Sequence, residues 1–162
     1  MIRKANISDS KQIIELEKGY YDGYSISENV LVKWINNGNF FAIEEDSKLV
    51  GSIYFEFLDE IKDLAWEHEP IKGPCKFIYI SEVAVDSPDR IPILFDEVLK
   101  SAELNKCEAI VWLTGEGGNH DKTERKFLEK NDFKLFKKVE SWECFPGHFI
   151  QDHSLWLKEI KL

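Results

Sequence analysis

The stretch from residue 76 to residue 104 reads as a buried strand followed directly by a turn and a helix. Residues 77–85 are rich in β-branched and aromatic side chains, which favour a strand. After Pro88 the apolar residues recur at the three- and four-residue spacing of a helix: Ile93, Leu94, Val98, Leu99 and Ala102. Such a junction directs backbone N–H groups and a helix N-terminus beyond the end of the strand. The sequence therefore predicts an α/β protein whose central junction suits an anionic ligand.

The length and composition fit one domain. The chain has 162 residues, of which 43% are hydrophobic, and domains typically have about 100–150 residues. No apolar run approaches the roughly 20 residues of a membrane-spanning helix, and the first residues lack the apolar core of a signal peptide. We therefore expect a soluble cytoplasmic protein with no membrane partner.

The net charge and the cysteines limit the kinds of partner and metal site that we expect. The net charge of −9 argues against nucleic acid, since nucleic-acid-binding proteins usually carry a basic face. A cationic partner is compatible with this charge, but a solvated acidic surface with no ligand preference gives the same balance. Cys75, Cys107 and Cys144 form no CxxC pair, so neither a disulfide framework nor a metal site is expected.

Periodicity and turn residues predict alternating strands and helices, with an irregular acidic segment at 58–74 and a glycine-rich loop at 114–120. Tyr20, Tyr21 and Tyr24 suit either a pocket wall or the packed end of a helix. The expected elements are a strand at 2–5, a helix capped by Ser8 or Asp9 and ending near 20, a helix from Ser27 to 36–38, strands at 40–45, 49–57 and 77–85, a helix after residue 90, a strand at 107–113, a helix from Asp121 or Thr123 to 130, and strands at 133–145 and 153–160.

This order of elements resembles the GNAT N-acyltransferase fold over essentially the whole chain. Residues 1–9 look like the family's opening strand and capped helix, and residues 49–53 look like its third strand. Residues 127–133, F-L-E-K-N-D-F, look like the helix-to-strand segment that the family writes F-Y-E-K-x-G-F. The resemblance implies a single domain over residues 1–162. It also implies a mixed, mostly antiparallel sheet with a splayed parallel pair of central strands and helices on both faces.

The resemblance also implies where acyl-CoA would bind. In the family the pantetheine makes strand-like hydrogen bonds to the fourth strand, and the pyrophosphate lies on a loop of the pattern R/Q-x-x-G-x-G/A. An asparagine at the start of a later helix often contacts the cofactor. The matching positions of this sequence are Val83, Ala84 and Val85 for the strand, Arg90, Ile91, Pro92 and Ile93 for the loop, and Asp121 for the asparagine.

The sequence departs from the family pattern at two places. Ile91, Ile93 and Phe95 occupy the positions of the loop glycines, and Pro92 removes one backbone donor. Leu128 stands where many members have the tyrosine that protonates the departing thiolate. The pyrophosphate loop is therefore degenerate, and leucine cannot transfer a proton.

For catalysis the resemblance points to the fourth strand. The family deprotonates its amine substrate with a carboxylate or a water molecule relayed from one, which favours Glu82 as the general base. Tyr79, on the same strand, is the alternative proton donor. His120 and His148 fall on expected loops, where histidines are commonly plain surface residues.

Two functions follow as expectations. The first is transfer of an acyl group from acyl-CoA, with acetyl-CoA as the expected donor, to an amine of a small molecule or peptide. Glu44, Glu45 and the acidic segment would attract a cationic acceptor, and a homodimer is expected by analogy with the family. The second is a catalytically inactive GNAT-like binding module that has lost acyl-CoA binding, which the degenerate loop and Leu128 favour. We favour the enzyme.

Overall fold

The computed structural model describes residues 1–58, 76–115, 118–139, 142–145, 148–150 and 153–161. The acidic segment predicted at 58–74 therefore lies, apart from Leu58, outside the described residues. Among the described residues, none of the helices is long and apolar enough to cross a membrane.

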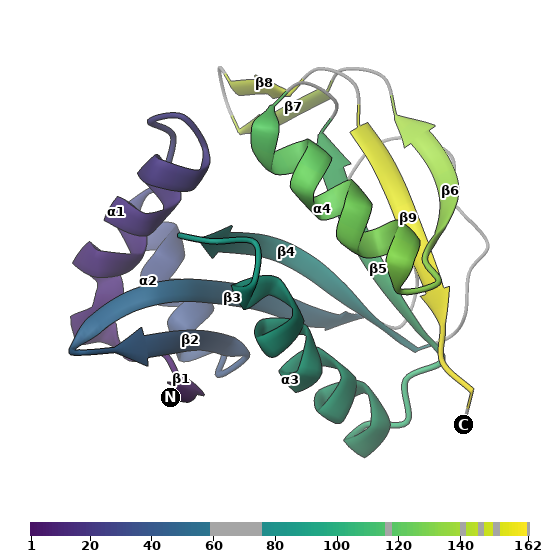
Figure 1. Cartoon of the computed structure of the whole chain (residues 1–162), viewed down its shortest axis with the longest axis horizontal. Coiled ribbons are helices and arrows are strands. Elements are labelled where there is room, and N and C mark those ends of the chain that lie inside the picture. Colours follow the sequence, from purple (N-terminus) through teal and green to yellow (C-terminus); the bar gives the residue numbers. More distant parts are fainter. Residues whose placement is uncertain (59–75, 116–117, 140–141, 146–147, 151–152, 162) are drawn as a thin grey trace. The chain divides into compact units, whose positions relative to one another are not determined.

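A mixed, mostly antiparallel sheet of seven strands carries the fold, and β4 and β5 are its parallel pair. This confirms the predicted fold class. Side by side, the strands are β1 (Ile2–Lys4), β2 (Phe40–Glu45), β3 (Lys48–Leu58), β4 (Phe77–Val85), β5 (Ala109–Gly115), β9 (His153–Glu159) and β6 (Lys134–Val139) (Figure 1).

The chain forms two compact units, which are described separately. The N-terminal unit comprises Met1–Glu56 and Ile80–Lys100, and the C-terminal unit comprises Phe57–Tyr79 and Ser101–Leu162. Strand β4 contributes its first residues to the C-terminal unit and residues 80–85 to the N-terminal unit.

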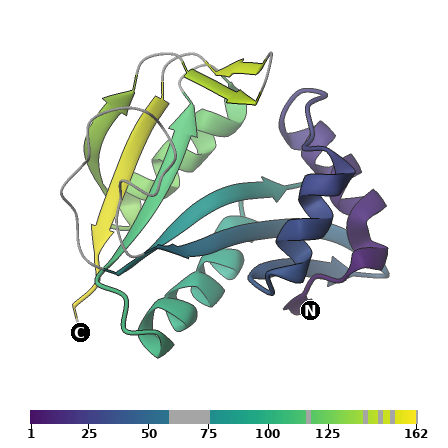
Figure 2. The same ribbon diagram turned by 180° about the vertical axis from the view of Figure 1, so that it is seen from behind.

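In the N-terminal unit, helices cover both faces of the strands. Helices α1 (Ser10–Tyr20) and α2 (Glu28–Asn36) lie on one face, and α3 (Arg90–Leu104) lies on the other (Figures 1 and 2). Helix α3 approaches β3 closely at Gly51, where an added Cβ would lie 3.4 Å from Leu94 Cδ1 and 3.5 Å from Arg90 Cβ. These two distances to α3 are ordinary contacts, whereas Ile43 Cδ1 on β2 would lie closer, at 3.2 Å.

The cap of the first helical segment agrees with the prediction only in part. A short 3-10 helix (Ile7–Asp9) precedes α1, and Asn6 caps it by accepting a hydrogen bond from the N–H of Ser8 at 3.0 Å. In turn, the side chain of Asp9 accepts a hydrogen bond from the N–H of Asn6 at 2.8 Å. Asp9 is the N-cap residue of α1, as one of the two predictions has it, but its side chain makes no capping hydrogen bond to α1, and the reciprocal capping box lies one element earlier, at Asn6.

In the C-terminal unit, α4 (Asn119–Lys130) covers one face of β5, β9 and β6 (Figures 1 and 2). Its core contains Phe77 and Tyr79 of β4 packed with Ala109, Val111 and Leu155. Helix α4 starts earlier than predicted, at Asn119, because Gly118 is its N-cap residue and Asp121 is already its third helical residue.

The single strand predicted at 133–145 is wrong. Strand β6 ends at Val139, which pairs with His153, the first residue of β9. Strand β7 (Trp142–Phe145) pairs with β8 (His148–Ile150) in a separate two-stranded sheet. His148 therefore lies on a strand rather than on a loop.

A buried carboxyl group anchors the loop between α1 and α2. The side chain of Glu17 is fully buried, and its Oε2 accepts a hydrogen bond from the N–H of Ile26 at 3.1 Å. The Glu17 carbonyl also accepts from the N–H of Tyr21 at 2.7 Å. Gly23, with φ at +96°, then turns the chain in a conformation that glycine adopts readily. Glu17 thus holds both ends of the loop that carries Tyr21.

Burial raises the pKa of the Glu17 carboxyl to about 7. Between its ordinary pKa near 4.5 and this value, the folded protein keeps a proton that the unfolded chain has lost, so stability falls as the pH rises through this window. We expect Glu17→Gln, which keeps an acceptor but cannot ionise, to remove this part of the pH dependence. Between pH 4.5 and pH 7, the free energy of unfolding of the variant should rise, relative to that of the original protein, by up to about 3 kcal/mol.

Urea denaturation across this pH range measures the effect. Glu15→Gln, at an exposed position on the same helix, is the matched control and should leave the slope unchanged. Equal slopes for the original protein and Glu17→Gln would show that Glu17 titrates normally in the fold.

Candidate functional site

The second half of β4 brings most of the predicted site residues together in the N-terminal unit. Val83, Ala84 and Val85 are buried, and Glu82 beside them is half-buried. The N–H of Asp86 donates to the carbonyl of Val50 on β3 at 3.0 Å. Successive residues of a strand direct their backbone groups to alternate edges, so Ala84 faces β3 whereas Val83 and Val85 face the opposite edge.

Tyr21 marks this opposite edge of β4. Its hydroxyl donates a hydrogen bond to the carbonyl of Val83, which is 62 residues away in sequence. We call this side of the strand, with the backbone groups of Ser81, Val83 and Val85, the Tyr21 edge. The contact shows that a backbone acceptor of β4 is reached by a side-chain donor there. From the sequence alone, Tyr21 fits either a pocket wall or the packed end of a helix. No nearby residue indicates that its partner lies 62 residues away.

Glu17 is a second residue that the sequence reasoning missed. A signal was present, since Glu17 follows Ile13 by four residues and therefore lies on the buried face of α1. A carboxyl at such a position predicts a buried ionisable group. In the structure this group fixes the loop from which Tyr21 reaches β4.

Arg90, predicted to bind phosphate, is held by carboxylates of its own unit. Its two terminal nitrogens donate to the two oxygens of Glu45 at 2.7 and 2.8 Å. Its Nε lies 3.6 Å from Oδ1 of Asp86. A bidentate arginine–carboxylate pair is strong and geometrically specific. A phosphate would have to compete with Glu45 for the guanidinium.

The backbone of the first turn of α3 is also occupied. The N–H of Arg90 donates to the carbonyl of Ser87 at 3.1 Å, and that of Ile91 donates to Pro88 at 3.2 Å. Pro92 has no N–H. The first three residues of the helix therefore present no N–H group to a ligand, which removes the usual reason for an anion to bind at a helix N-terminus.

The bulky residues at the glycine positions divide between core and surface. Ile91 and Phe95 are 1% and 3% exposed and turn into the core, whereas Ile93 is 41% exposed. This turn is poorly suited to a pyrophosphate, because its first three helical residues present no free N–H group and Arg90 is paired with Glu45. Phosphate binding by Arg90, Ile91, Pro92 and Ile93 stays a prediction, and this geometry argues against it.

Two predicted residues lie in the C-terminal unit. Tyr79 packs in the core against β5. Asp121 is 4% exposed and accepts a hydrogen bond from the N–H of Gly118 at 2.7 Å, with His120 Nε2 3.3 Å away. Asp121 therefore stabilises the start of α4. Its contact with a cofactor, and the proton transfer assigned to Tyr79 or Glu82, stay predictions.

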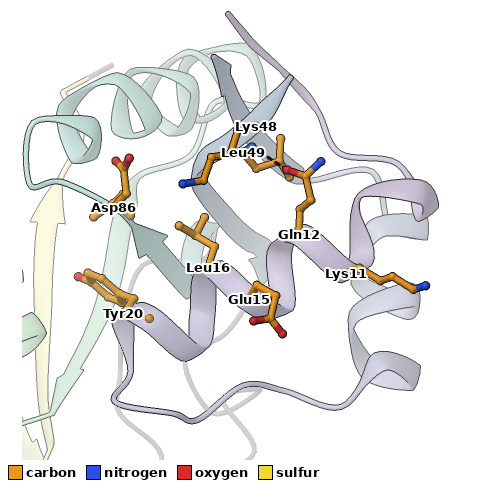
Figure 3. A pocket seen from close by; sticks show the side chains of 10 residues that line it. Lys11, Gln12, Glu15, Leu16, Tyr20, Lys48, Leu49 and Asp86 are labelled. Atoms are coloured by element: carbon orange, nitrogen blue, oxygen red, sulfur yellow. Dashed lines mark hydrogen bonds between the residues drawn. The ribbon is translucent and has the colours of Figure 1, made fainter. Parts of the chain in front are cut away.

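A pocket of about 590 Å³ lies beside the C-terminal end of β4 in the N-terminal unit (Figure 3). One face of α1 forms one wall, and the start of β3 and the end of β4 form the other. Its lining residues are Lys11, Gln12, Glu15, Leu16, Gly19, Tyr20, Lys48, Leu49, Val85 and Asp86. Within the described ranges, no three His, Cys, Asp or Glu side chains gather closely enough to hold a metal ion.

Comparison with known proteins gives a result only at the level of structure. No protein-family model matches the chain, and no curated protein matches it. NAA60 of Arabidopsis thaliana, solved in complex with acetyl-CoA, has a TM-score of 0.72 at 17% identity over 99% of this chain and 98% of that one. The same plant protein has also been solved with a bisubstrate analogue.

Two bacterial structures agree with this match. A probable acetyltransferase from Staphylococcus epidermidis has a TM-score of 0.75 at 16% identity, and the match covers 99% of both chains. A GNAT-family acetyltransferase from Streptococcus agalactiae has a TM-score of 0.68 at 18% identity, over 100% of this chain and 96% of that one. At these identities the likeness concerns the fold. The chain has the fold of the GNAT acetyltransferases, as its sequence resemblance predicted.

Proposed function

We propose that this protein is an N-acyltransferase that uses acetyl-CoA as donor and an amine of a small molecule or peptide as acceptor. The observation that carries the proposal is the full-length match to NAA60, which was solved with acetyl-CoA. The Tyr21 edge supports it, because a strand-like ligand needs backbone groups that face away from the neighbouring strand.

The reaction requires a group that accepts the proton of the amine and groups that stabilise the negative charge on the thioester oxygen. The neutral amine attacks the thioester carbonyl, a C–N bond forms, the C–S bond breaks and the thiolate leaves. Backbone N–H groups of β4 would stabilise the negative charge on the carbonyl oxygen. Glu82 would take the proton of the amine, directly or through one water molecule, and Tyr79 is the alternative residue for protonating the thiolate.

The alternation along β4 refines the predicted donor site. Val83 and Val85 direct their backbone groups to the Tyr21 edge, where a pantetheine arm could extend the ladder. Ala84 directs its backbone groups to β3, and its side chain is fully buried. The proposed donor-binding residues are thus Val83 and Val85.

The acceptor's charge is less constrained than the sequence suggested. Arg3 binds Glu44 at 2.7 Å and also pairs with Asp9, and Arg90 binds Glu45 and lies near Asp86. The oxygens of Glu44 and Glu45 that hold these arginines are less available to a cationic substrate. The bisubstrate complex of NAA60 is consistent with an amine acceptor. The homodimer and the cytoplasmic location remain part of this proposal.

An inactive binding module is the second candidate, and two observations favour it. The N-terminus of α3 is occupied, as described above. Leu128, at the position of the family's tyrosine, is fully buried and faces away from solvent. Neither observation removes the Tyr21 edge, on which the first proposal depends.

Calorimetric titration with acetyl-CoA separates the two candidates. We expect saturable one-to-one binding with a dissociation constant below 1 mM, because the donor of a transferase must bind at cellular concentrations. Desulfo-CoA, which keeps the nucleotide but lacks the sulfur, should compete. The absence of any heat of binding at millimolar acetyl-CoA would contradict the enzyme and leave the binding module.

The role of Glu82 is tested by Glu82→Gln with any amine that the protein acetylates. We expect kcat/KM to fall by about 10²–10⁴, the usual contribution of a general base, and its rise with pH to disappear. Glu103→Gln on an exposed position of α3 is the control. If kcat/KM of the Glu82 variant depends on pH as that of the original protein does, Glu82 is not the general base.

A further inference from the structure

The segment between α1 and α2, residues 21–27, begins with Tyr21 and follows the end of α1 (Figure 1). We call it the Tyr21 loop. Backbone hydrogen bonds close its first part: the N–H of Tyr21 donates to the carbonyl of Glu17 at 2.7 Å, and that of Gly23 donates to the carbonyl of Lys18 at 2.7 Å. The loop therefore starts as a tight continuation of the last turn of α1.

The carboxyl group of Glu17 attaches the second part of the Tyr21 loop to α1. Glu17 is fully buried, and its Oε2 accepts a hydrogen bond from the N–H of Ile26 at 3.1 Å. Its Oε1 is also buried and has no hydrogen-bond partner among the described residues. One side-chain hydrogen bond thus fixes residue 26. Both ends of the loop are attached to Glu17, one through its backbone and the other through its carboxyl group.

The backbone of the Tyr21 loop has an uncommon conformation between these two attachments. Asp22 and Gly23 both have left-handed φ angles, +53° and +96°. Glycine adopts this region readily, whereas other residues are uncommon there, although aspartate tolerates it better than most. Such a conformation persists when the surrounding contacts hold it. We therefore expect the loop to relax when one of its two attachments is lost.

The Tyr21 loop places a hydroxyl group on the edge of β4 where the acyl donor is proposed to bind. The Tyr21 hydroxyl donates to the carbonyl of Val83, and the Tyr21 ring packs edge-on against Tyr20 with 4.9 Å between the ring centroids. A strand-like ligand on the Tyr21 edge would direct an N–H group to the same carbonyl. The Tyr21 hydroxyl and the ligand therefore compete for one acceptor.

We propose that Tyr21 is a gate on this edge: its hydroxyl occupies the Val83 carbonyl until an acyl donor displaces it. Glu17 is the positioning residue that holds the gate closed, through Ile26 and the Tyr21 loop. The proposal rests on the proposed function, because it describes how the same edge opens for the donor. The donor binds the open state, so its apparent affinity is lowered by the fraction of molecules in which the gate is closed.

Tyr21→Phe tests the gate, because it removes the hydroxyl and keeps the ring. Loss of this one hydrogen bond should raise the fraction of open molecules, and calorimetry should show acetyl-CoA binding about two- to tenfold more tightly. With any amine that the protein acetylates, the KM for acetyl-CoA should fall while kcat stays the same. Tyr20→Phe makes the same chemical change on the neighbouring ring and is the control, which should alter neither constant.

Glu17→Met tests the positioning role, because it keeps the length of the side chain but removes the acceptor of the Ile26 N–H. Acetyl-CoA should again bind more tightly. Combined with Tyr21→Phe, the variant should give no further gain, because both changes open the same gate. Glu17→Gln keeps the acceptor and should restore the affinity of the original protein. Thermal melts show that each variant is folded, and Glu17→Leu takes the place of Glu17→Met if that variant does not fold.

The possible failures are distinct. If Tyr21→Phe binds acetyl-CoA no more tightly than Tyr20→Phe does, the hydroxyl does not compete with the donor, and the gate is overturned while the proposed function stands. If the effects of Glu17→Met and Tyr21→Phe add, Glu17 does not act through Tyr21, and its positioning role is overturned. If neither the original protein nor any variant binds acetyl-CoA, the proposed function itself fails, and the gate with it.

Discussion

Burial of the second half of β4 is the constraint on which the N-terminal unit depends. Helices cover both faces of the strands here, so Val83, Ala84 and Val85 have their side chains in packed surroundings. The side chains of Val83 and Ala84 could not bind a ligand without loss of packing. The backbone groups on the Tyr21 edge are better placed for recognition, and the hydrogen bond from Tyr21 shows that this edge accepts a donor. A ligand that resembles a strand is what such an edge can hold.

The same packing explains why the β4–α3 junction lost its suitability for phosphate. Ile91 and Phe95 fill the core beneath the first turn of α3, and Arg90 ties that turn to Glu45. Each of these contacts stabilises the position of α3. Together they use groups that would otherwise contact an anion at this junction.

The sequence predicted the elements of the fold well, because they depend on local periodicity. The strand at 77–85 and the hairpin at 40–57 agree with β4 and with β2 and β3. The prediction failed where the partner of a segment or side chain decides the outcome. Residues 142–145 belong to a separate sheet because they pair with β8, and Arg90 is occupied because Glu45, 45 residues away, lies beside it. For the same reason the contact between Tyr21 and Val83 could not be predicted from the sequence. The burial of Glu17, in contrast, could have been predicted from its helical spacing to Ile13.

We propose that the acyl donor binds along the Tyr21 edge of β4. The most direct test is nuclear magnetic resonance of the backbone amides of β4 during a titration with acetyl-CoA. We expect the amides of Val83 and Val85 to shift and to become protected from hydrogen exchange, whereas the amide of Ala84, which faces β3, changes little. Saturable binding of acetyl-CoA that leaves the Val83 and Val85 amides unchanged would contradict the account.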